Sequence, residues 1–399
     1  MSVTSFLLHF LKNPKAFIQR ASLKYAYKTV PDVFMFRTLR GYRTEAYYRD
    51  FYVKLNGYTF VVPLGMFYGF MKQRPQHIAM QMRRFFPVLY YTGTLFHNYD
   101  NVKGIHQEAE NFWLVNDGIN GNSVFDVPKK IYYLYYPIDH EWYVRKDQDS
   151  LVIYDYFDDI DISPRYNAAT EARHRFLLER ADLILVSSAK LYDQVPQVYR
   201  HKTLLVTNGV DVQHFEREYI YQRDKKRFTL GFYGALEYWI DLELIEKIAA
   251  SNLYDIILIG PVLDDRFRRL ERFAHVRMLG HRAYEALPKL VEEIDLFMLP
   301  FRVNDLTKSV SPVKLYEHFA TGKPVVSTAL PECMRYDTVV VMNHENWKDA
   351  IEAAIGKIGD ENYITRARRY AHENSWEQKA EVIASRLREL IAQKAEHAV

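Results

Sequence analysis

Lys314 and Glu317 are the two residues of this sequence whose types and spacing point most directly to chemistry. They lie three positions apart in the stretch 309–328, which reads SVSPVKLYEHFATGKPVVST. In a helix that starts here, the first-turn amides and the positive end of the dipole form an anion site, to which Lys314 adds a full charge. Glu317 then lies roughly 4.5 Å further along the axis, where a carboxylate can accept from ribose hydroxyls. The pair therefore suits a nucleoside diphosphate; the simpler alternative is an ion pair on a solvated helix face.

The same stretch contains the signals that would place this pair on a short helix. Ser311 is a good N-cap, Pro312 suits the first helical position, and Gly322 can end the helix in a left-handed conformation. Val313 begins the apolar side of the predicted helix, whereas the charged pair falls on the opposite side. The spacing therefore predicts a short helix with one apolar and one charged side, followed by a buried strand.

The whole run resembles the donor-nucleotide signature of GT-B glycosyltransferases of the family 4 type. In those enzymes a Pro-x-Lys-x-x-Glu helix is followed by a small-Gly-x-Pro-Val-Val turn. The resemblance implies two doubly wound Rossmann-like domains that face a cleft, and a donor site in which Ser311, Pro312 and Val313 accompany the charged pair. Many members carry a second Glu eight residues before the helix Glu, near the donor sugar, and this chain has Ser309 there. The resemblance therefore implies the nucleotide contacts but leaves the sugar contacts open.

Polar residues also gather in the first half of the chain, in the run Arg-Pro-Gln-His at 74–77. This run follows a predicted strand and loop and begins a predicted helix at Pro75. In an open parallel sheet such loops lie at the carboxyl ends of the strands, where ligands bind. Arg74, Gln76 and His77 are therefore predicted to meet an acceptor or the donor phosphates, with helix capping as the structural alternative. The run resembles the opening signature of a teichuronic-acid-biosynthesis-type subset of these transferases.

A cluster of carboxylates follows another predicted strand, in the run Tyr-Asp-x-x-Asp-Asp at 154–159, and the same subset carries a similar run. Alternation along the strand sends Asp155 and Asp159 one way and Asp158 the other, so one or two of them are expected to face the cleft. A single carboxylate can be the general base for an acceptor hydroxyl, whereas a pair can hold a divalent cation. We favour the base and predict no metal and no cofactor, because Lys314 and the helix start already meet the phosphate charge. Helix capping or loop solvation is the alternative for each Asp.

Further donor contacts are predicted in the second half. The predicted strand FTLGFYGAL runs into a turn at Gly234 whose amides are uncovered, since glycine has no side chain. Many family 4 enzymes have Arg and Lys on the phosphates after this glycine, where this chain has Ala235 and Trp239. The run 237–241 resembles instead a Glu-aromatic-x-Asp pattern of the teichuronic-acid-type subset. By resemblance, the loop that begins at Gly280 grips the nucleobase edge through its backbone. The donor residues predicted in these loops are Gly234, Glu237, His281 and Arg282.

The length of 399 residues is too great for one ordinary core and fits two domains. Strands and helices alternate along both halves at the spacing of crossover units, which predicts an α/β fold with parallel sheets covered on both faces. The predicted organisation is a basic amphipathic helical extension at 1–50, an acceptor-side Rossmann-like domain at 51–205, a nucleotide-sugar donor domain at 206–375, and a C-terminal helix at 376–399 that can cross back to the first domain.

Composition is that of a soluble globular chain, with 48% hydrophobic and 26% charged residues. The single cysteine, Cys333, excludes an internal disulfide framework and agrees with a reducing compartment. No run approaches the ~20 apolar residues of a membrane helix, and the opening SFLLHFL lacks the basic lead of a signal peptide. We therefore expect a cytoplasmic protein.

Positive charge is concentrated at the start, where residues 1–50 contain nine Lys or Arg against three Asp or Glu. Apolar residues are interleaved with these charges, and a basic amphipathic helix can lie on the inner face of an anionic membrane, near a polyprenyl-linked acceptor. The alternative is a helical extension packed on the first domain. A nucleic-acid partner is not expected, because the basic excess is confined to this segment.

Together these inferences predict a GT-B glycosyltransferase of surface polysaccharide biosynthesis. It would move a sugar from a nucleoside-diphosphate sugar to a glycan or polyprenyl-linked acceptor. Two alternatives stay open. A nucleotide-sugar epimerase of the same architecture would act without an acceptor, and a transferase-like binding subunit would lack catalysis, as the missing Glu, Arg and Lys suggest. The sequence leaves open the sugar, the base and whether the anomeric configuration is inverted.

Overall fold

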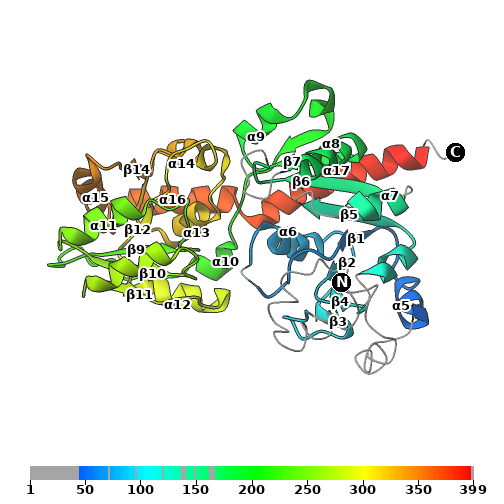
Figure 1. Ribbon diagram of the computed structural model, residues 1–399, viewed down its shortest axis with the longest axis horizontal. Helices are drawn as coiled ribbons and strands as arrows, with labels where there is room; N and C mark the ends of the chain where they lie inside the picture. The colour runs from blue at the N-terminus through cyan, green and yellow to red at the C-terminus, as the bar shows by residue number, and fades with distance from the viewer. Residues whose placement is uncertain are drawn as a thin grey trace, which may run out of the picture.

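The computed structural model describes residues 45–70, 72–94, 97–118, 121–135, 141–147, 150–160 and 167–396. They form two α/β domains that lie side by side, the first with an eight-stranded sheet and the second with a six-stranded sheet (Figure 1). Most of the extension predicted at 1–50 lies outside the described residues. Its final part, from residue 45, begins helix α5 (Glu45–Tyr52).

The sheet of the first domain has the order β3-β4-β2-β1-β5-β6-β7-β8. All neighbouring strands are parallel, except that β3 runs antiparallel to β4. The expectation of a wholly parallel sheet is wrong at this edge, because Asn111 takes a left-handed conformation (φ 57°) that closes a tight turn between these two strands. The strands are β1 (Thr59–Val62), β2 (Val88–Tyr91), β3 (Gly104–Ala109), β4 (Phe112–Asn116), β5 (Lys130–Tyr135), β6 (Leu151–Tyr156), β7 (Leu183–Val186) and β8 (Thr203–Leu205).

Helices cover both faces of this sheet, which is why its central strands are buried along their whole length. Successive residues of a strand point to opposite faces. Phe60 belongs to the core that includes helix α6, whereas Val61 belongs to the core under α5 and α8. The described helices of this domain are α6 (Arg74–Met82), α7 (Glu141–Lys146), α8 (Ala168–Arg180), α9 (Ala189–Gln194) and the 3₁₀ helices η1 (Asn122–Asp126) and η2 (Gln197–Lys202).

The second domain has a wholly parallel sheet with the order β11-β10-β9-β12-β13-β14. Its strands are β9 (Thr229–Tyr233), β10 (Asp255–Ile259), β11 (Val276–Met278), β12 (Leu296–Leu299), β13 (Val325–Ser327) and β14 (Val339–Val341). Its helices are α10 (Val212–Phe215), α11 (Leu242–Ala250), α12 (Leu287–Leu290), α13 (Val313–Thr321), α14 (Pro331–Met334), α15 (Trp347–Ile355) and α16 (Glu361–Glu373), with the 3₁₀ helices η3 (Asp265–Arg272), η4 (Tyr284–Ala286), η5 (Val291–Glu293) and η6 (Thr307–Ser309).

The chain crosses between the domains twice, and the two crossings lie side by side (Figure 1). The first follows β8, and the second joins α16 to α17 (Trp376–Glu396). They are bonded to each other, because the Val210 amide donates to the Asn374 carbonyl at 3.0 Å and the Trp376 amide donates to the Val210 carbonyl at 3.0 Å. Helix α17 then packs into the core of the first domain beside α6. The last helix therefore belongs structurally to the first domain.

Each sheet reverses its strand order once, between β1 and β5 in the first domain and between β9 and β12 in the second. Open α/β sheets bind ligands outside the carboxyl ends of the strands at such points. The loop after β1 leads into α6, and the segment after β12 leads into α13. Loops from the two sheets meet across the domains, since Lys72 Nζ lies 3.3 Å from Glu285 Oε1. A shared ligand site is therefore expected in the crevice between these edges.

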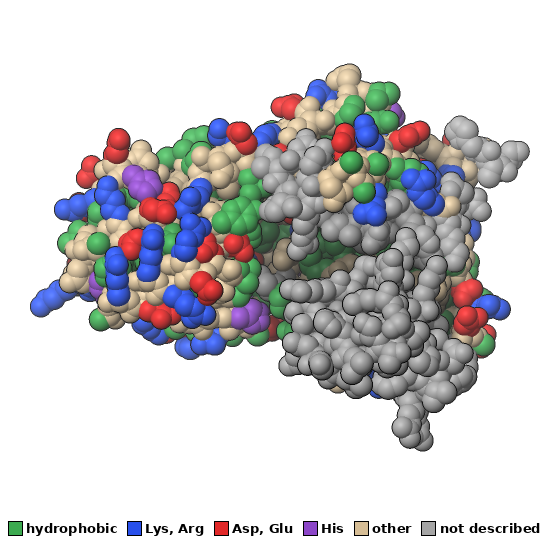
Figure 2. Space-filling view, viewed as in Figure 1, with side chains coloured by type: hydrophobic (Ala, Val, Ile, Leu, Met, Phe, Trp, Pro, Cys, Tyr) green, Lys and Arg blue, Asp and Glu red, His purple; other side chains and the backbone are tan. Residues whose placement is uncertain are grey.

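The surface of the second domain carries charges of both signs. Figure 2 shows its Lys and Arg side chains interspersed with Asp and Glu, and hydrophobic side chains gathered where the two domains meet. Across the described ranges, no helix is both long enough and apolar enough to cross a bilayer.

Candidate functional site

Helix α13 begins one residue later than predicted. Pro312 is its N-cap, Val313 its first residue, and Gly322 ends it at φ 69°. Ser311 does not cap the helix because it is bonded to the first domain crossing. Its Oγ accepts from the Asn208 amide at 3.2 Å, and its carbonyl accepts from the Asn208 side chain at 2.6 Å. No described side chain caps α13, so its first amides are available to a ligand.

Glu317 lies on a buried side of this helix, not on a solvated one. Its side chain is 1% exposed and that of Lys314 is 23% exposed, with Lys314 Nζ 3.0 Å from Glu317 Oε2. Neither carboxylate oxygen accepts a hydrogen bond of good geometry from the described part of the chain. The alternative of a solvent-exposed ion pair is therefore wrong. The described neighbours of Glu317 that can donate are Lys314 and, without good geometry, the Tyr233 hydroxyl. A buried carboxylate that keeps unused acceptor positions is costly, and it points to a ligand that supplies further donors.

Other polar groups without a described hydrogen-bond partner surround Glu317. They include the hydroxyls of Tyr233 and Tyr284 and Nε2 of His77. Lys314 Nζ lies 5.0 Å from the centre of the Tyr233 ring, and the rings of His77 and Tyr284 are 5.3 Å apart. The site therefore combines residues of both domains, since His77 comes from α6 and the others come from the second domain.

Burial fixes the protonation of this cluster. Burial, followed by the charge of Glu317, holds the pKa of both Tyr233 and Tyr284 far above the ordinary value, so both hydroxyls are donors. Burial, followed by the charge of Lys314, lowers the pKa of His77 to about 3, so its ring is neutral. The cluster thus offers an ammonium group, a carboxylate, two hydroxyl donors and a neutral imidazole. This set can bind a polar, anionic ligand with hydroxyl groups.

Two glycines bring bare backbone to the same edge of the second sheet. Gly234 follows β9 with φ 148°, and Gly260 follows β10 with φ 146°. A Cβ on Gly260 would lie 1.9 Å from the Gly234 carbonyl oxygen, so only glycine fits there. The Gly234 turn lies at the end of the strand next to β12, on the side where α13 begins.

The other predicted donor residues have side chains away from this cluster. Glu237 is half-buried and its Oε1 accepts from the neighbouring Tyr238 amide at 3.0 Å. His281 is exposed and stacks on Phe70 of the first domain, with ring centres 6.3 Å apart. Arg282 is exposed and donates to the His281 carbonyl. A role of this loop in binding would therefore use its backbone.

Arg74 and Asp155 are bonded to each other and not to the crevice. Arg74 Nε lies 2.7 Å from Asp155 Oδ2, and the two side chains are 2% and 0% exposed. Tyr133 also donates to Asp155. Arg74 Nη1 donates to the carbonyl oxygen of Thr207 and to Oδ1 of Asn208 on the domain crossing. Burial and pairing therefore give both residues a structural role, and the ligand contact of Arg74 and the base role of Asp155 stay predictions that this geometry does not favour.

Because this ion pair is buried, we expect Arg74→Ala to destabilise the protein strongly. Removing one partner leaves an uncompensated buried charge, which costs about 3–5 kcal/mol. For a domain of this size that corresponds to a fall of roughly 6–20 °C in Tm. Thermal unfolding followed by circular dichroism measures it, with Arg83→Ala, at the half-buried C-cap of α6, as the control. An unchanged Tm for Arg74→Ala would contradict the structural role.

Gln76 is also structural. It is 1% exposed, its carbonyl oxygen accepts from the Gln73 amide, and its Nε2 donates to the carbonyls of Phe67 and Phe70. These bonds do not favour the predicted contact of Gln76 with a ligand, which stays a prediction. Gln76 holds the loop after β1, and of the three predicted residues at the start of α6 only His77 reaches the cluster around Glu317.

Of the three aspartates, Asp158 is the one that is exposed. Asp159 is 3% exposed, and its Oδ2 accepts from Gln194 at 3.0 Å and lies 3.6 Å from Lys190 Nζ. Lys190 in turn donates to the Asp305 carbonyl of the second domain at 2.6 Å. This pairing occupies the Asp159 carboxylate, so the catalytic role of Asp159 stays a prediction that the geometry does not favour.

Asp158 has water access but is enclosed by protein on several sides. Desolvation, followed by the negative charge of Asp155, raises its pKa to about 6. Because its neighbour Asp159 connects through Lys190 to the second domain, Asp158 lies where the two domains approach. A carboxylate with this pKa is ionised at neutral pH and basic enough to accept a proton from a substrate.

Sequence reasoning missed Tyr233, Tyr284 and Asn208. Tyr233 is the last residue of β9, directly before Gly234, so its position at a strand end was a usable signal. Tyr284 begins η4 and Asn208 lies in the domain crossing. Their roles depend on contacts with residues far away in sequence, which no local pattern encodes.

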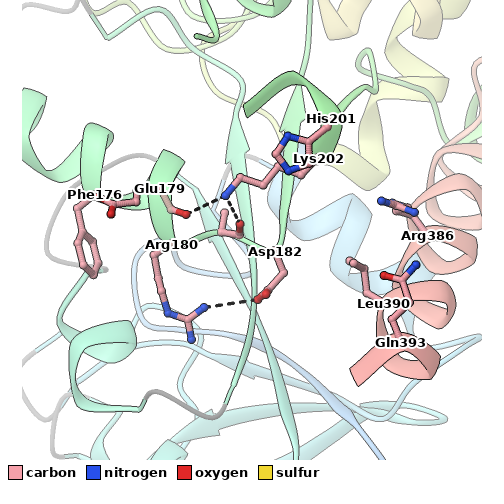
Figure 3. A pocket seen from close by; sticks show the side chains of 10 residues that line it. Phe176, Glu179, Arg180, Asp182, His201, Lys202, Arg386, Leu390 and Gln393 are labelled. Carbon is pink, nitrogen blue, oxygen red and sulfur yellow. Dashed lines mark hydrogen bonds and ion pairs between the residues drawn. The ribbon is translucent and has the colours of Figure 1, made fainter. Parts of the chain in front are cut away.

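A cavity of about 680 Å³ lies elsewhere, between α8, η2 and α17 (Figure 3). Its residues Asp182 and Lys202 precede β7 and β8, so it lies at the amino ends of these strands, opposite the crevice. Its buried charges already have partners. Lys202 donates to the carbonyls of Glu179 and Ala181 at the end of α8, and Arg180 pairs with Asp182. We therefore place the candidate site in the crevice.

Two Rossmann-like sheets whose carboxyl edges share one crevice define the GT-B fold, and solved structures agree. The sucrose-phosphate synthase of Thermosynechococcus elongatus aligns with a TM-score of 0.64 at 13% identity, covering 85% of this chain and 100% of that one. Anabaena HepE in complex with UDP and glucose aligns with a TM-score of 0.58 at 14% identity, covering 83% and 99%. A third structure, titled trehalose-6-phosphate from E. coli bound with UDP-2-fluoro glucose, aligns with a TM-score of 0.58 at 10% identity, covering 82% and 98%.

Sequence comparison identifies the second domain more closely. Residues 227–359 match the family described as glycosyl transferases group 1. The chain is also 29% identical over 254 residues to TuaH of Bacillus subtilis (strain 168), a candidate teichuronic acid biosynthesis glycosyltransferase. That match covers 56% of this chain and 64% of TuaH, which is less than two thirds of the relative. The protein therefore has the GT-B fold, and residues 227–359 of its second domain match the glycosyl transferases group 1 family.

Proposed function

We propose that this protein is a glycosyltransferase that moves a sugar from a nucleoside-diphosphate sugar to a glycan or lipid-linked acceptor in surface polysaccharide biosynthesis. The group 1 domain and the relation to TuaH support the reaction class and the biological setting. Two fold neighbours were solved with UDP or a UDP-sugar, which supports a nucleotide-sugar donor.

One observation carries the donor assignment: Glu317 is a buried carboxylate whose oxygens accept no well-formed hydrogen bond from the described residues. In the proposed complex the two ribose hydroxyls donate to these oxygens. The diphosphate then lies at the uncapped start of α13, near Lys314 and the Gly234 turn, where amides and the ammonium group meet its charge. Because the protein itself supplies the positive charge that balances the diphosphate, no metal ion is needed, and we expect activity to persist in the presence of EDTA.

The same arrangement supports transfer. An acceptor hydroxyl oxygen attacks the anomeric carbon, the bond from that carbon to the diphosphate oxygen breaks, and the nucleoside diphosphate leaves with the electron pair. The hydroxyl proton passes to Asp158, whose raised pKa suits it as the base. Lys314 and the start of α13 stabilise the charge on the leaving group. The remaining finer proposals are a cytoplasmic location and contact with the inner face of the cell membrane through residues 1–50, supported by their basic excess.

The donor assignment is tested by thermal shift with UDP, GDP, ADP and dTDP. A ligand that binds only the folded state, at about 100 times its Kd, stabilises by ~2.7 kcal/mol, which raises the Tm by several degrees. We expect one diphosphate to give the largest shift and its monophosphate a smaller one. If none of the four shifts the Tm, the donor assignment fails.

Turnover separates the proposed function from its alternatives. We incubate the protein with UDP-glucose, UDP-galactose and UDP-N-acetylglucosamine, with and without a panel of oligosaccharides, and quantify UDP and nucleotide sugars. A transferase forms UDP faster when an acceptor is present. Isomerised nucleotide sugar without an acceptor would identify an epimerase, and binding without any turnover would identify a non-catalytic subunit.

A further inference from the structure

Three aromatic rings form an open cluster at the rim of the crevice, outside the donor site. Phe67 and Phe70 lie in the loop after β1, and Tyr99 lies in the loop after β2, so all three stand at the carboxyl edge of the first sheet. Tyr99 lies 5.9 Å from Phe67 and 5.4 Å from Phe70, measured between ring centres. Phe70 is 43% exposed and Tyr99 is 56% exposed. Large aromatic rings held in water at the mouth of a crevice are typical of binding surfaces.

The loop under these rings is held by polar side chains from elsewhere in the domain. Asp100 accepts from the amides of Tyr68 and Gly69 at 2.8 and 2.7 Å and from the Thr92 hydroxyl. Gln76 donates to the carbonyls on either side of these amides, at Phe67 and Phe70. The backbone of 67–70 is therefore fixed from both sides, while the Phe70 ring is exposed and the Phe67 ring is half-buried. Such a fixed loop is pre-organised for a ligand and loses little conformational entropy on binding.

The exposed apolar area of this cluster and the charged groups beside it indicate the kind of ligand that it can bind. Among the described residues of these two loops, the exposed large hydrophobic side chains are Phe70 and Tyr99, so the open apolar area is that of about one or two rings. That area suits a sugar ring, whereas a polyprenyl chain needs a longer apolar groove. The charges of this rim are already engaged, because Asp100 is bonded to the amides of Tyr68 and Gly69 and Lys72 lies 3.3 Å from Glu285, so the rim favours a neutral ligand.

The geometry points to a saccharide-binding platform, made of Phe67, Phe70 and Tyr99, that stacks on a neutral sugar ring of the acceptor. This inference rests on the proposed glycosyltransferase function and names the part of the acceptor that the first domain recognises. The platform lies beside the second domain, since Phe70 also stacks on His281. An acceptor glycan bound here has its reactive end near the crevice and its remaining units directed outwards.

Binding of maltotriose, cellotriose and chitotriose to the full chain, with UDP present, is measured by saturation-transfer NMR. We expect at least one of these to bind, and its affinity to fall about tenfold in Phe70→Ala and about tenfold in Tyr99→Ala, because each ring contributes a stacking contact. Phe70→Tyr and Tyr99→Phe keep the rings and should keep the affinity. Tyr47→Ala, which removes a similarly exposed ring from α5, is the matched control and should have no effect.

Two results would overturn the platform. One is that no oligosaccharide binds the wild type, or that binding survives loss of both rings. The other is that His281→Ala lowers the affinity as much as Phe70→Ala does, since the rings would then act only as a contact between the domains. The UDP-induced Tm shift is recorded for every variant and should equal that of the wild type. A platform that fails while the UDP shift is retained leaves the proposed function standing, whereas loss of the shift in the wild type contradicts that function.

Discussion

Replacing Glu317 by Gln is expected to weaken UDP binding by about 100-fold without destabilising the empty protein. A hydrogen bond to a charged group contributes ~1.5–3 kcal/mol, and two ribose hydroxyls would lose the charged acceptor, so a loss near 3 kcal/mol corresponds to about 100-fold. In the empty protein the same carboxylate is buried beside Lys314 and gains no good hydrogen bond from the described residues. A neutral amide of the same shape removes that desolvation cost but also the ion pair with Lys314, whose side chain is 23% exposed and can be hydrated instead, so we expect the Tm to change little.

Isothermal titration with UDP and thermal unfolding measure the two effects together. Glu332→Gln is the matched control, because Glu332 is also a buried glutamate of the second domain but accepts from the Tyr316 hydroxyl at 2.7 Å and pairs with Arg335. We expect the control to lose stability and to keep its UDP affinity. Wild-type affinity in Glu317→Gln would remove the ribose role of this residue.

Asp158→Asn is expected to lower kcat by about 10²–10⁴-fold while the affinity for the donor stays unchanged. The amide keeps the shape of the side chain but cannot accept the proton of the acceptor hydroxyl. Steady-state kinetics with an active acceptor, together with titration of UDP, separate these effects. Asp159→Asn should reduce turnover much less, because Asp159 is bonded to Gln194 and Lys190 and acts on the loop geometry. Full activity in Asp158→Asn would exclude it as the base.

The pH profile gives a second, independent test of this base. Burial and the charge of Asp155 raise the pKa of Asp158 to about 6, and the base acts only when it is deprotonated. The value of kcat/KM should therefore be level above about pH 7 and fall tenfold per pH unit below about pH 6. The acidic limb should disappear from the residual activity of Asp158→Asn. A limb that persists in this variant would belong to another group.

The fold could be predicted from the sequence because local patterns of apolar residues indicate its strands and helices. Apolar runs of four to six residues, such as those of β1 and β9, alternate with helices at crossover spacing. The antiparallel edge was missed because it depends on the backbone conformation of Asn111, which the apolar pattern does not report. Lys314 and Glu317 could be paired from sequence because three-residue spacing on a helix fixes their separation.

The site was harder to predict where a side chain bonds to a residue that is far away in the sequence. Arg74 and Asp155 both carry suitable chemistry, but they lie 81 positions apart and bind each other in the core. Local sequence could not reveal this, since either residue alone looks like a ligand contact. For the same reason the burial of Glu317 was missed. Its side of α13 is polar, yet Tyr233 and Tyr284 and a histidine of the first domain close over it.

The central claim is that a nucleoside diphosphate binds in the crevice, with its phosphates at the start of α13 and its ribose at Glu317. A crystal structure of the full chain with UDP tests this most directly. We predict both ribose hydroxyls within hydrogen-bond distance of the Glu317 carboxylate and the diphosphate beside Lys314 and the Gly234 turn. UDP bound in the cavity between α8 and α17, or bound with its ribose away from Glu317, would contradict the account.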